Sequence, residues 1–162
     1  MDVKNKRVVV TGAASGIGKA LCEAFYQAGA QSLIAVDMNL DGAQETADSV
    51  NGIAIQANVG NEKDIINVIK KADEHVDGTD IFCSNAGIGG VPGFFEVEAS
   101  DWQNIWDVNV QSHIFAAKHV LPQMIERGEG YLVNTSSAAG LLTQLGAAGY
   151  SVTKAAAVSF AE

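Results

Sequence analysis

Two side chains near the end of the chain could together carry out acid–base chemistry. Tyr150 and Lys154 lie four positions apart, and on a helix residues at this spacing share one face. A free tyrosine is only about 0.1% phenolate at pH 7, but one ammonium at about 4 Å favours the phenolate by roughly 4 kcal/mol at an effective dielectric of about 20. Such a phenol can take the proton of an alcohol as a hydride leaves. For the two residues alone, a surface Tyr–Lys pair is the alternative.

Ser137 is a third candidate, because it lies 13 residues before Tyr150 and directly after an apolar run that predicts a strand. A hydroxyl there could donate a hydrogen bond to the substrate oxygen and stabilise charge on it. In an open parallel sheet the carboxyl ends of the strands form the crevice where ligands bind. We therefore expect Ser137, Asn85 and a glycine-rich turn at residues 12–18 to converge at this edge.

The glycine-rich turn, Gly12-Ala-Ala-Ser-Gly-Ile-Gly18, stands between a predicted strand and a predicted helix. Glycines let the backbone approach a pyrophosphate, and the helix N-terminus offers unpaired N–H groups. Asp37 ends the second predicted strand, 19 positions after Gly18. A carboxylate there accepts hydrogen bonds from the ribose hydroxyls of NAD and repels the 2′-phosphate of NADP. The pattern predicts NAD; a plain tight turn and an exposed acid are the alternatives.

Short apolar runs alternate with amphipathic stretches along the whole chain, which predicts an α/β fold with a parallel sheet covered on both faces. No linker or repeat divides residues 1–162, so we expect one domain. The predicted strands cover residues 7–11, 32–37, 53–57, 80–84 and 131–135. The predicted helices cover residues 17–28, 41–50, 61–75, from an N-cap at Ser100 to about Leu121, and from about Gly149 onward.

Composition narrows the classes of partner. The formal net charge of −9 over 162 residues makes nucleic acid an unfavourable partner. No apolar run reaches membrane-spanning length, and the N-terminus has no apolar signal region, so we expect a cytoplasmic protein without a membrane partner. Cys22 and Cys83 are expected to be reduced core residues. The three histidines have no metal spacing, so no metal is predicted.

Taken together, these residues resemble the NAD-dependent branch of the short-chain dehydrogenase/reductase family over nearly the whole chain. The family's motifs occur here in order as Thr11-Gly12-x-x-x-Gly16-x-Gly18, Asp37, Asn58-Val59, Asn85-Ala86-Gly87, Asn109, Ser137, Tyr150 and Lys154. The resemblance implies a Rossmann-type doubly wound parallel sheet of about five strands in the order 3-2-1-4-5. It also implies an NAD-dependent oxidoreductase that acts on a small-molecule secondary alcohol or ketone.

The resemblance assigns a role to each matching position. Tyr150 would be the acid–base group, Lys154 would favour its phenolate and bind the nicotinamide ribose, and Ser137 would position the substrate. Asn109 would hold a water in a proton relay behind Lys154, or would simply be a polar residue that kinks a long helix. The implied cofactor-binding residues are Gly12, Ser15, Gly16, Ile17, Gly18, Asp37, Asn58, Val59, Asn85, Ala86, Gly87, Tyr150 and Lys154. The family more often has Asp where this chain has Asn58.

The chain departs from the family in length, because members are about one and a half times as long and have further strands. The resemblance therefore implies that the last two family strands are absent and that the substrate pocket is only partly built. An impaired or non-catalytic NAD-binding fragment that works only in an assembly is the alternative function. We also expect a homo-oligomer, a dimer or tetramer. Loops 88–95 and 138–148 are expected to line the pocket, where Phe94, Leu141, Leu142 and Leu145 form an apolar wall or only pack locally.

Overall fold

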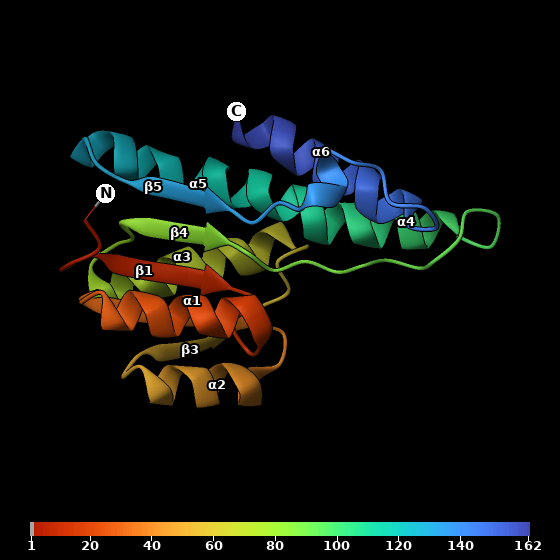
Figure 1. Ribbon diagram of the computed structural model, residues 1–162. Coiled ribbons are helices and arrows are strands. Elements are labelled where there is room, and N and C mark those ends of the chain that lie inside the picture. Colours follow the sequence, from red (N-terminus) through yellow and green to blue (C-terminus); the bar gives the residue numbers. More distant parts are fainter. Residues whose placement is uncertain (1) are drawn as a thin grey trace.

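Five parallel strands form one sheet in the computed structural model, which describes residues 2–162 (Figure 1). The strand order is β3-β2-β1-β4-β5, with every neighbouring pair parallel, so the predicted class and order are confirmed. The central strand β1 pairs Val9 with Ile34 of β2 and with Phe82 of β4. The strands are β1 (Arg7–Thr11), β2 (Ser32–Asp37), β3 (Ile53–Gln56), β4 (Ile81–Ser84) and β5 (Tyr131–Asn134).

Helices cover both faces of the sheet, because the strands carry apolar side chains on both faces. Val8 and Val10 of β1 lie in one core cluster with residues of α1 (Gly16–Gln27) and α2 (Leu40–Ser49). Val9 points the other way, into a second cluster with α3 (Glu62–Val76) and α5 (Ser112–Arg127). The uninterrupted run Val8-Val9-Val10 therefore places a valine in each core in turn.

The long helix predicted from Ser100 to about Leu121 differs from the structure at both ends and in the middle. It begins as α4 (Ala99–Trp106) with Glu98 rather than Ser100 at the N-cap, where the Glu98 N–H donates to Asp101 Oδ2 at 3.0 Å. A π-helical segment (Asp107–Gln111) follows, and α5 then continues through Pro122. Buried Val120 and Met124, on either side of Pro122, anchor α5 on the core, so the proline does not end the helix.

The last helix, α6 (Ala148–Ala161), lies beside α4 at the carboxyl end of the sheet (Figure 1). A short 3₁₀ segment (Ala138–Gly140) connects β5 to the loop before α6 and packs directly on that helix. β5 forms one edge of the sheet, and none of its residues is fully buried. Among residues 2–162, no helix combines the length and the apolarity needed to span a membrane.

Candidate active site

A cavity of about 480 Å³ opens at the carboxyl edge of the sheet, where its wall is formed by the last residue of β2 and by segments that begin directly after β1, β4 and β5. This volume falls within the range of small-molecule and cofactor sites. The lining residues are Gly12, Ser15, Gly16, Ile17, Gly18, Asp37, Asn85, Ala86, Gly87, Ile88, Gly89, Thr135, Ser136, Tyr150 and Lys154. The structure therefore brings most of the predicted cofactor residues together around one space.

The turn between β1 and α1 forms the floor of this cavity. Gly16 has φ +52°, and a Cβ built there would meet nothing within 4 Å, so this corner of the turn faces open space. At Gly18 a Cβ would lie 2.0 Å from the carbonyl oxygen of Gly12, which only glycine can accommodate. The N-cap residue Ser15 makes no side-chain hydrogen bond to the helix. The first N–H groups of α1 are therefore not satisfied by a capping side chain, as an anion-binding helix start requires.

Asp37 holds its carboxylate at the cavity wall through two backbone hydrogen bonds. Its Oδ2 accepts from the Ala14 N–H and its Oδ1 from the Asn39 N–H, both at 3.0 Å. Among the lining residues, Lys154 is the only lysine or arginine. Lys154 Nζ donates to the Thr135 carbonyl, and the hollow beyond Asp37 is lined by no lysine or arginine that could receive a phosphate there.

A smaller hollow of about 160 Å³ extends the cavity past Asp37. Asn58 and Val59 line it together with Met38, Ala57 and Val108, so the two predicted residues lie where a ring could be enclosed. The Asn58 side chain also stabilises its own turn, because its Oδ1 accepts from the Gly60 N–H at 3.0 Å. This carbonyl oxygen keeps one lone pair for a ligand.

Asn85 and Ala86 are fixed to the end of β1 by Thr11. The Thr11 hydroxyl donates to the Cys83 carbonyl at 3.1 Å and accepts from the N–H groups of Asn85 at 3.0 Å and Ala86 at 3.1 Å. The Asn85 side chain donates in turn to the Thr11 carbonyl at 3.0 Å. Thr11 was part of the sequence motif without an assigned role; a buried threonine at a strand end before a glycine turn is the signal that points to this bracing.

Tyr150 and Lys154 both face the cavity from the first turns of α6, as their spacing predicts. Lys154 Nζ lies 5.8 Å from the centroid of the Tyr150 ring and donates to the Thr135 carbonyl at 2.9 Å. Lys154 is 3% exposed, and this burial lowers the pKa of its ammonium. The Thr135 carbonyl was not among the predicted site groups, because every non-proline residue carries a carbonyl and its position is visible only in the fold.

Ser137 and Asn109, two of the four predicted catalytic residues, are not in the cavity wall. The Ser137 hydroxyl accepts from the Ala139 N–H at 3.2 Å and caps the 3₁₀ segment, while its neighbours Thr135 and Ser136 line the cavity. This leaves the hydroxyl proton of Ser137 free to donate.

Asn109 is completely buried in the π-helical segment, where it holds the loop after β4. Its Oδ1 accepts from the Ile88 N–H, and its Nδ2 donates to the Ile88 carbonyl, both at 2.9 Å. The second Nδ2 hydrogen goes to Thr153 Oγ1 at 3.1 Å. A Cβ built on Gly87 would lie 3.3 Å from Asn109 Oδ1 and 3.5 Å from Lys154 Nζ, so the glycine leaves a space between these two polar atoms.

No cluster of three or more His, Cys, Asp or Glu side chains that could hold a metal ion occurs within residues 2–162.

Comparison with known proteins relates this architecture to one large family. The family described as short chain dehydrogenase matches residues 6–162. The 3-oxoacyl-[acyl-carrier-protein] reductase of Vibrio cholerae is 32% identical over 162 residues, which cover 99% of this chain and 66% of that protein. An uncharacterized oxidoreductase of Bacillus subtilis is 34% identical over 169 residues, which cover 98% of this chain and 61% of that protein. The chain thus spans about two thirds of the length of these curated relatives.

Solved structures of related proteins have the same fold as this chain. A short chain dehydrogenase/reductase from Burkholderia phymatum in complex with NAD superimposes with a TM-score of 0.95 at 28% identity, covering 99% of this chain and 59% of the other. Levodione reductase superimposes with a TM-score of 0.92 at 25% identity, covering 97% of this chain and 64% of the other.

Proposed function

Because the chain belongs to the short-chain dehydrogenase/reductase family, we propose that it transfers a hydride between NAD(H) and a secondary alcohol or ketone, with Tyr150 as the acid–base group. The observation that carries this proposal is the meeting of three features around one cavity. These are an uncapped helix start after a glycine turn, a phenol, and a buried ammonium 5.8 Å from the phenol ring. An anion cradle beside a proton donor is what a dinucleotide-dependent hydride transfer needs.

The chain's own residues fit NAD. The glycine turn and Ser15 would receive the pyrophosphate at the start of α1, and Asp37 would accept hydrogen bonds from the adenosine ribose. The hollow lined by Asn58 and Val59 would hold the adenine. Asn85, Ala86 and Gly87 line the path from there toward Tyr150 and Lys154. NAD is favoured over NADP because the 2′-phosphate would approach the Asp37 carboxylate without a cation beside it.

In the proposed reaction the cofactor supplies or accepts the hydride, and the protein moves the proton. During reduction the Tyr150 hydroxyl donates its proton to the carbonyl oxygen, which becomes the alcohol hydroxyl; during oxidation the phenolate takes that proton back. Lys154, oriented by the Thr135 carbonyl, stabilises the phenolate and reaches the nicotinamide ribose. Ser137 donates a hydrogen bond to the same substrate oxygen.

Asn109 acts in this proposal through its position behind Lys154. The space left by Gly87 lies between Asn109 Oδ1 and Lys154 Nζ, and its polar walls suit one water molecule. Such a water would pass protons between Lys154 and the solvent side of the loop at Ile88. The hydrogen bond that Asn109 accepts from the Ile88 N–H and the one that it donates to Thr153 would fix its amide beside this space.

We also propose a homo-oligomer, a dimer or tetramer, that forms through the helices carrying Asn109 and Tyr150. Partly exposed apolar side chains support this: Trp106 on α4 is 37% exposed, and Val152 and Phe160 on α6 are 50% and 39% exposed. A clean monomer in sedimentation at micromolar concentration contradicts it.

Turnover with a panel of secondary alcohols tests the central proposal. We expect NADH absorbance to appear with NAD and at least one alcohol, and a lower kcat/KM with NADP.

A second candidate, an NAD-binding module that works only in an assembly, is favoured by the edge strand β5, which has no fully buried residue. Saturable NAD binding without turnover supports this second candidate. The absence of both NAD binding and thermal stabilisation by NAD contradicts both candidates.

A further inference from the structure

The loops that follow β4 and the 3₁₀ segment carry an unusual amount of exposed apolar surface. Leu145 is 97% exposed, Phe95 94%, and Leu142 75%. Contiguous exposed apolar patches on soluble proteins mark ligand or partner sites. We call this surface the apolar loop pair, made of Val91, Phe94, Phe95, Leu141, Leu142 and Leu145.

The two loops lie side by side, and the first of them extends beyond the start of α4 (Figure 1). The Gly93 N–H donates to the Gly146 carbonyl at 3.0 Å, and Gly93 forms a β-bridge with Ala147. The second loop is also fixed on α6, because the Gln144 N–H donates to Ser151 Oγ at 3.0 Å. The apolar surface is therefore held in place by backbone hydrogen bonds.

Both loops connect along the chain to the candidate active site, although none of the six apolar residues lines the cavity itself. The first loop leaves the cavity wall at Ile88 and Gly89. The second loop runs from the 3₁₀ segment capped by Ser137 to the start of α6, and its bridged residue Ala147 lies three positions before Tyr150. A molecule whose oxygen reaches Tyr150 and Ser137 would place the rest of its body toward these loops.

The charges around the loops are unfavourable for an anion. No lysine or arginine occurs between Lys71 and Lys118 or between Arg127 and Lys154. Lys154 is 3% exposed, and its Nζ already donates to the Thr135 carbonyl. The first loop carries exposed Glu96 and ends at exposed Glu98. A carboxylate or phosphate on the distal part of a substrate would lose water, find no cation, and approach two acids.

We infer that the substrate is an uncharged alcohol or ketone with a sizeable apolar body that packs on the apolar loop pair, and that the site selects against substrates with a distal carboxylate or phosphate. This inference rests on the proposed function for the position of the reacting oxygen. The apolar body of the substrate is favoured because it and the apolar loop pair are removed from water on binding. A distal anion is disfavoured because no cation lies there to pair with it.

A matched pair of ligands tests the inference by binding rather than by turnover. The two ligands are methyl hexyl ketone and the keto acid in which a carboxylate replaces the methyl at the far end of the hexyl chain. Both have the same chain length and the same methyl ketone group. Their dissociation constants are measured by ligand-observed NMR in the presence of NAD, which cannot reduce a ketone. We expect the ketone to bind at least about tenfold more tightly, the size of one lost charge interaction.

Two variants with the same added charge locate the effect. Leu142→Arg places a guanidinium on the apolar loop pair and is expected to shift the binding ratio toward the keto acid by about tenfold or more. Ile66→Arg changes an apolar residue that is 44% exposed on α3, which packs on α5 and β2, and should leave the ratio unchanged.

The outcomes separate this inference from the proposed function. Ketone binding with the expected ratio but without NADH-dependent turnover supports the inference and counts against the proposed function. Turnover together with equal or stronger binding of the keto acid by the unmodified chain overturns the inference alone, and so does a ketone that does not bind. If Leu142→Arg dissociates an oligomer in sedimentation without changing the ratio, a second copy of the chain covers the patch, and the inference is overturned.

Discussion

Asp37 is the residue that separates the two dinucleotides in this account, because its carboxylate faces the cavity and is held by two backbone N–H groups. Asp37→Asn keeps the size of the side chain and removes its charge. We expect the preference for NAD over NADP, measured as a ratio of dissociation constants, to fall by about tenfold to a hundredfold, since a charged hydrogen bond is worth about 1.5–3 kcal/mol. Glu45→Gln, at an exposed position of α2, is the control, and an unchanged ratio in Asp37→Asn contradicts the assignment.

Lys154 gives the proposed reaction an alkaline limit. Burial lowers the pKa of its ammonium, so it loses its charge at a lower pH than a free lysine does. If the charge stabilises the phenolate, kcat for alcohol oxidation falls as the pH rises through this lowered value. Lys154→Arg stays charged, because a guanidinium is not deprotonated in proteins. We expect lower activity in this variant but no alkaline fall below pH ~11; a fall at the same pH in both proteins contradicts the role.

Side-chain chemistry and spacing predicted Tyr150, Lys154, Asp37 and the glycine turn, and the structure places all of them around one cavity. Ser137 was predicted from its position after a strand and Asn109 from the family resemblance, and neither lies in the cavity wall. Which hydroxyl or amide turns toward a ligand depends on local hydrogen bonds, such as the cap from Ser137 to the Ala139 N–H. No pattern of residue types carries that information.

The π-helical segment between α4 and α5 positions the loop after β4 through Asn109. Asn109→Leu would leave the Ile88 N–H and carbonyl without their partner inside the protein. We expect the free energy of unfolding to fall by about 2–4 kcal/mol, the combined penalty of buried polar groups left unpaired. Urea denaturation measures this change. Asn104→Leu, at an exposed position of α4, should change the free energy of unfolding by less than about 0.5 kcal/mol. Equal changes in the two variants would show that the hydrogen bonds between Asn109 and Ile88 contribute nothing to stability.

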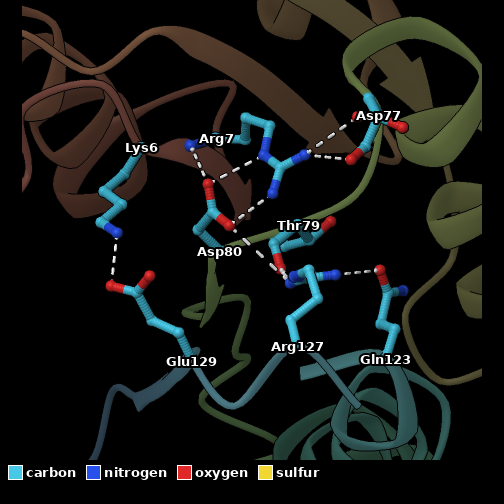
Figure 2. Close-up of polar contacts among 8 residues, drawn as sticks. All are labelled: Lys6, Arg7, Asp77, Thr79, Asp80, Gln123, Arg127 and Glu129. Atoms are coloured by element: carbon cyan, nitrogen blue, oxygen red, sulfur yellow. Dashed lines mark hydrogen bonds and ion pairs between the residues drawn. The ribbon is translucent and has the colours of Figure 1, made fainter. Parts of the chain in front are cut away.

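The amino edge of the sheet is fixed by a network of charges on the side opposite the cavity (Figure 2). Arg7 Nη2 donates to Asp80 Oδ1 at 2.6 Å and Arg7 Nε to Asp80 Oδ2 at 2.8 Å, which joins the start of β1 to the start of β4. Arg127, at the end of α5, lies 3.7 Å from the same carboxylate and donates to the Thr79 carbonyl. Three segments distant in sequence therefore meet at Asp80.

The guanidinium of Arg7 lowers the pKa of Asp80, which sets the direction of its pH dependence. A carboxyl with a lowered pKa in the folded state stabilises the protein above its unfolded pKa of about 3.9 and loses this contribution as the pH falls below it. Asp80→Asn should lower the free energy of unfolding at pH 7 by about 2–4 kcal/mol, because two arginines then lose their partner.

Denaturation of Asp80→Asn and the unmodified chain at several pH values measures this contribution. The difference in stability between the two proteins should shrink below pH ~4. Glu74→Gln breaks the exposed pair of Glu74 with Lys70 and serves as the control, with an effect below about 1 kcal/mol. A difference that grows on acidification contradicts the account.

The bounds of helices and strands depend partly on local sequence patterns and partly on packing against the core. The strand and helix alternation was predictable, and β1 and β2 have the predicted bounds. The end of the long helix was not predictable. Pro122 suggests an end near Leu121, but packing on the core continues the helix beyond the proline. The N-cap at Glu98 depends on the hydrogen bond with Asp101, whereas Ser100 looks like the better cap by residue type alone.

At the scale of the whole molecule, the amino ends and the carboxyl ends of the parallel strands carry different kinds of residues. The amino edge carries a network of paired charges, and the carboxyl edge collects the glycine turn, the carboxylate and the Tyr–Lys pair from segments far apart in the sequence (Figures 1 and 2). The ordered motifs predicted the gathering of residues at the carboxyl edge, because parallel strands bring their carboxyl ends together. The pairing of the loops through Gly93 and Gly146 was not predictable, since it depends on backbone atoms that every residue has.

The most direct test of the central claim compares two tyrosine variants of the intact chain. Tyr150→Phe removes only the proposed proton donor, whereas Tyr131→Phe makes the same change on the edge strand β5. We predict that kcat for alcohol oxidation with NAD falls by about a hundredfold to ten-thousandfold in Tyr150→Phe, with NAD binding within twofold of the unmodified chain, and that Tyr131→Phe keeps full activity. Turnover by Tyr150→Phe at the rate of the unmodified chain would contradict the account.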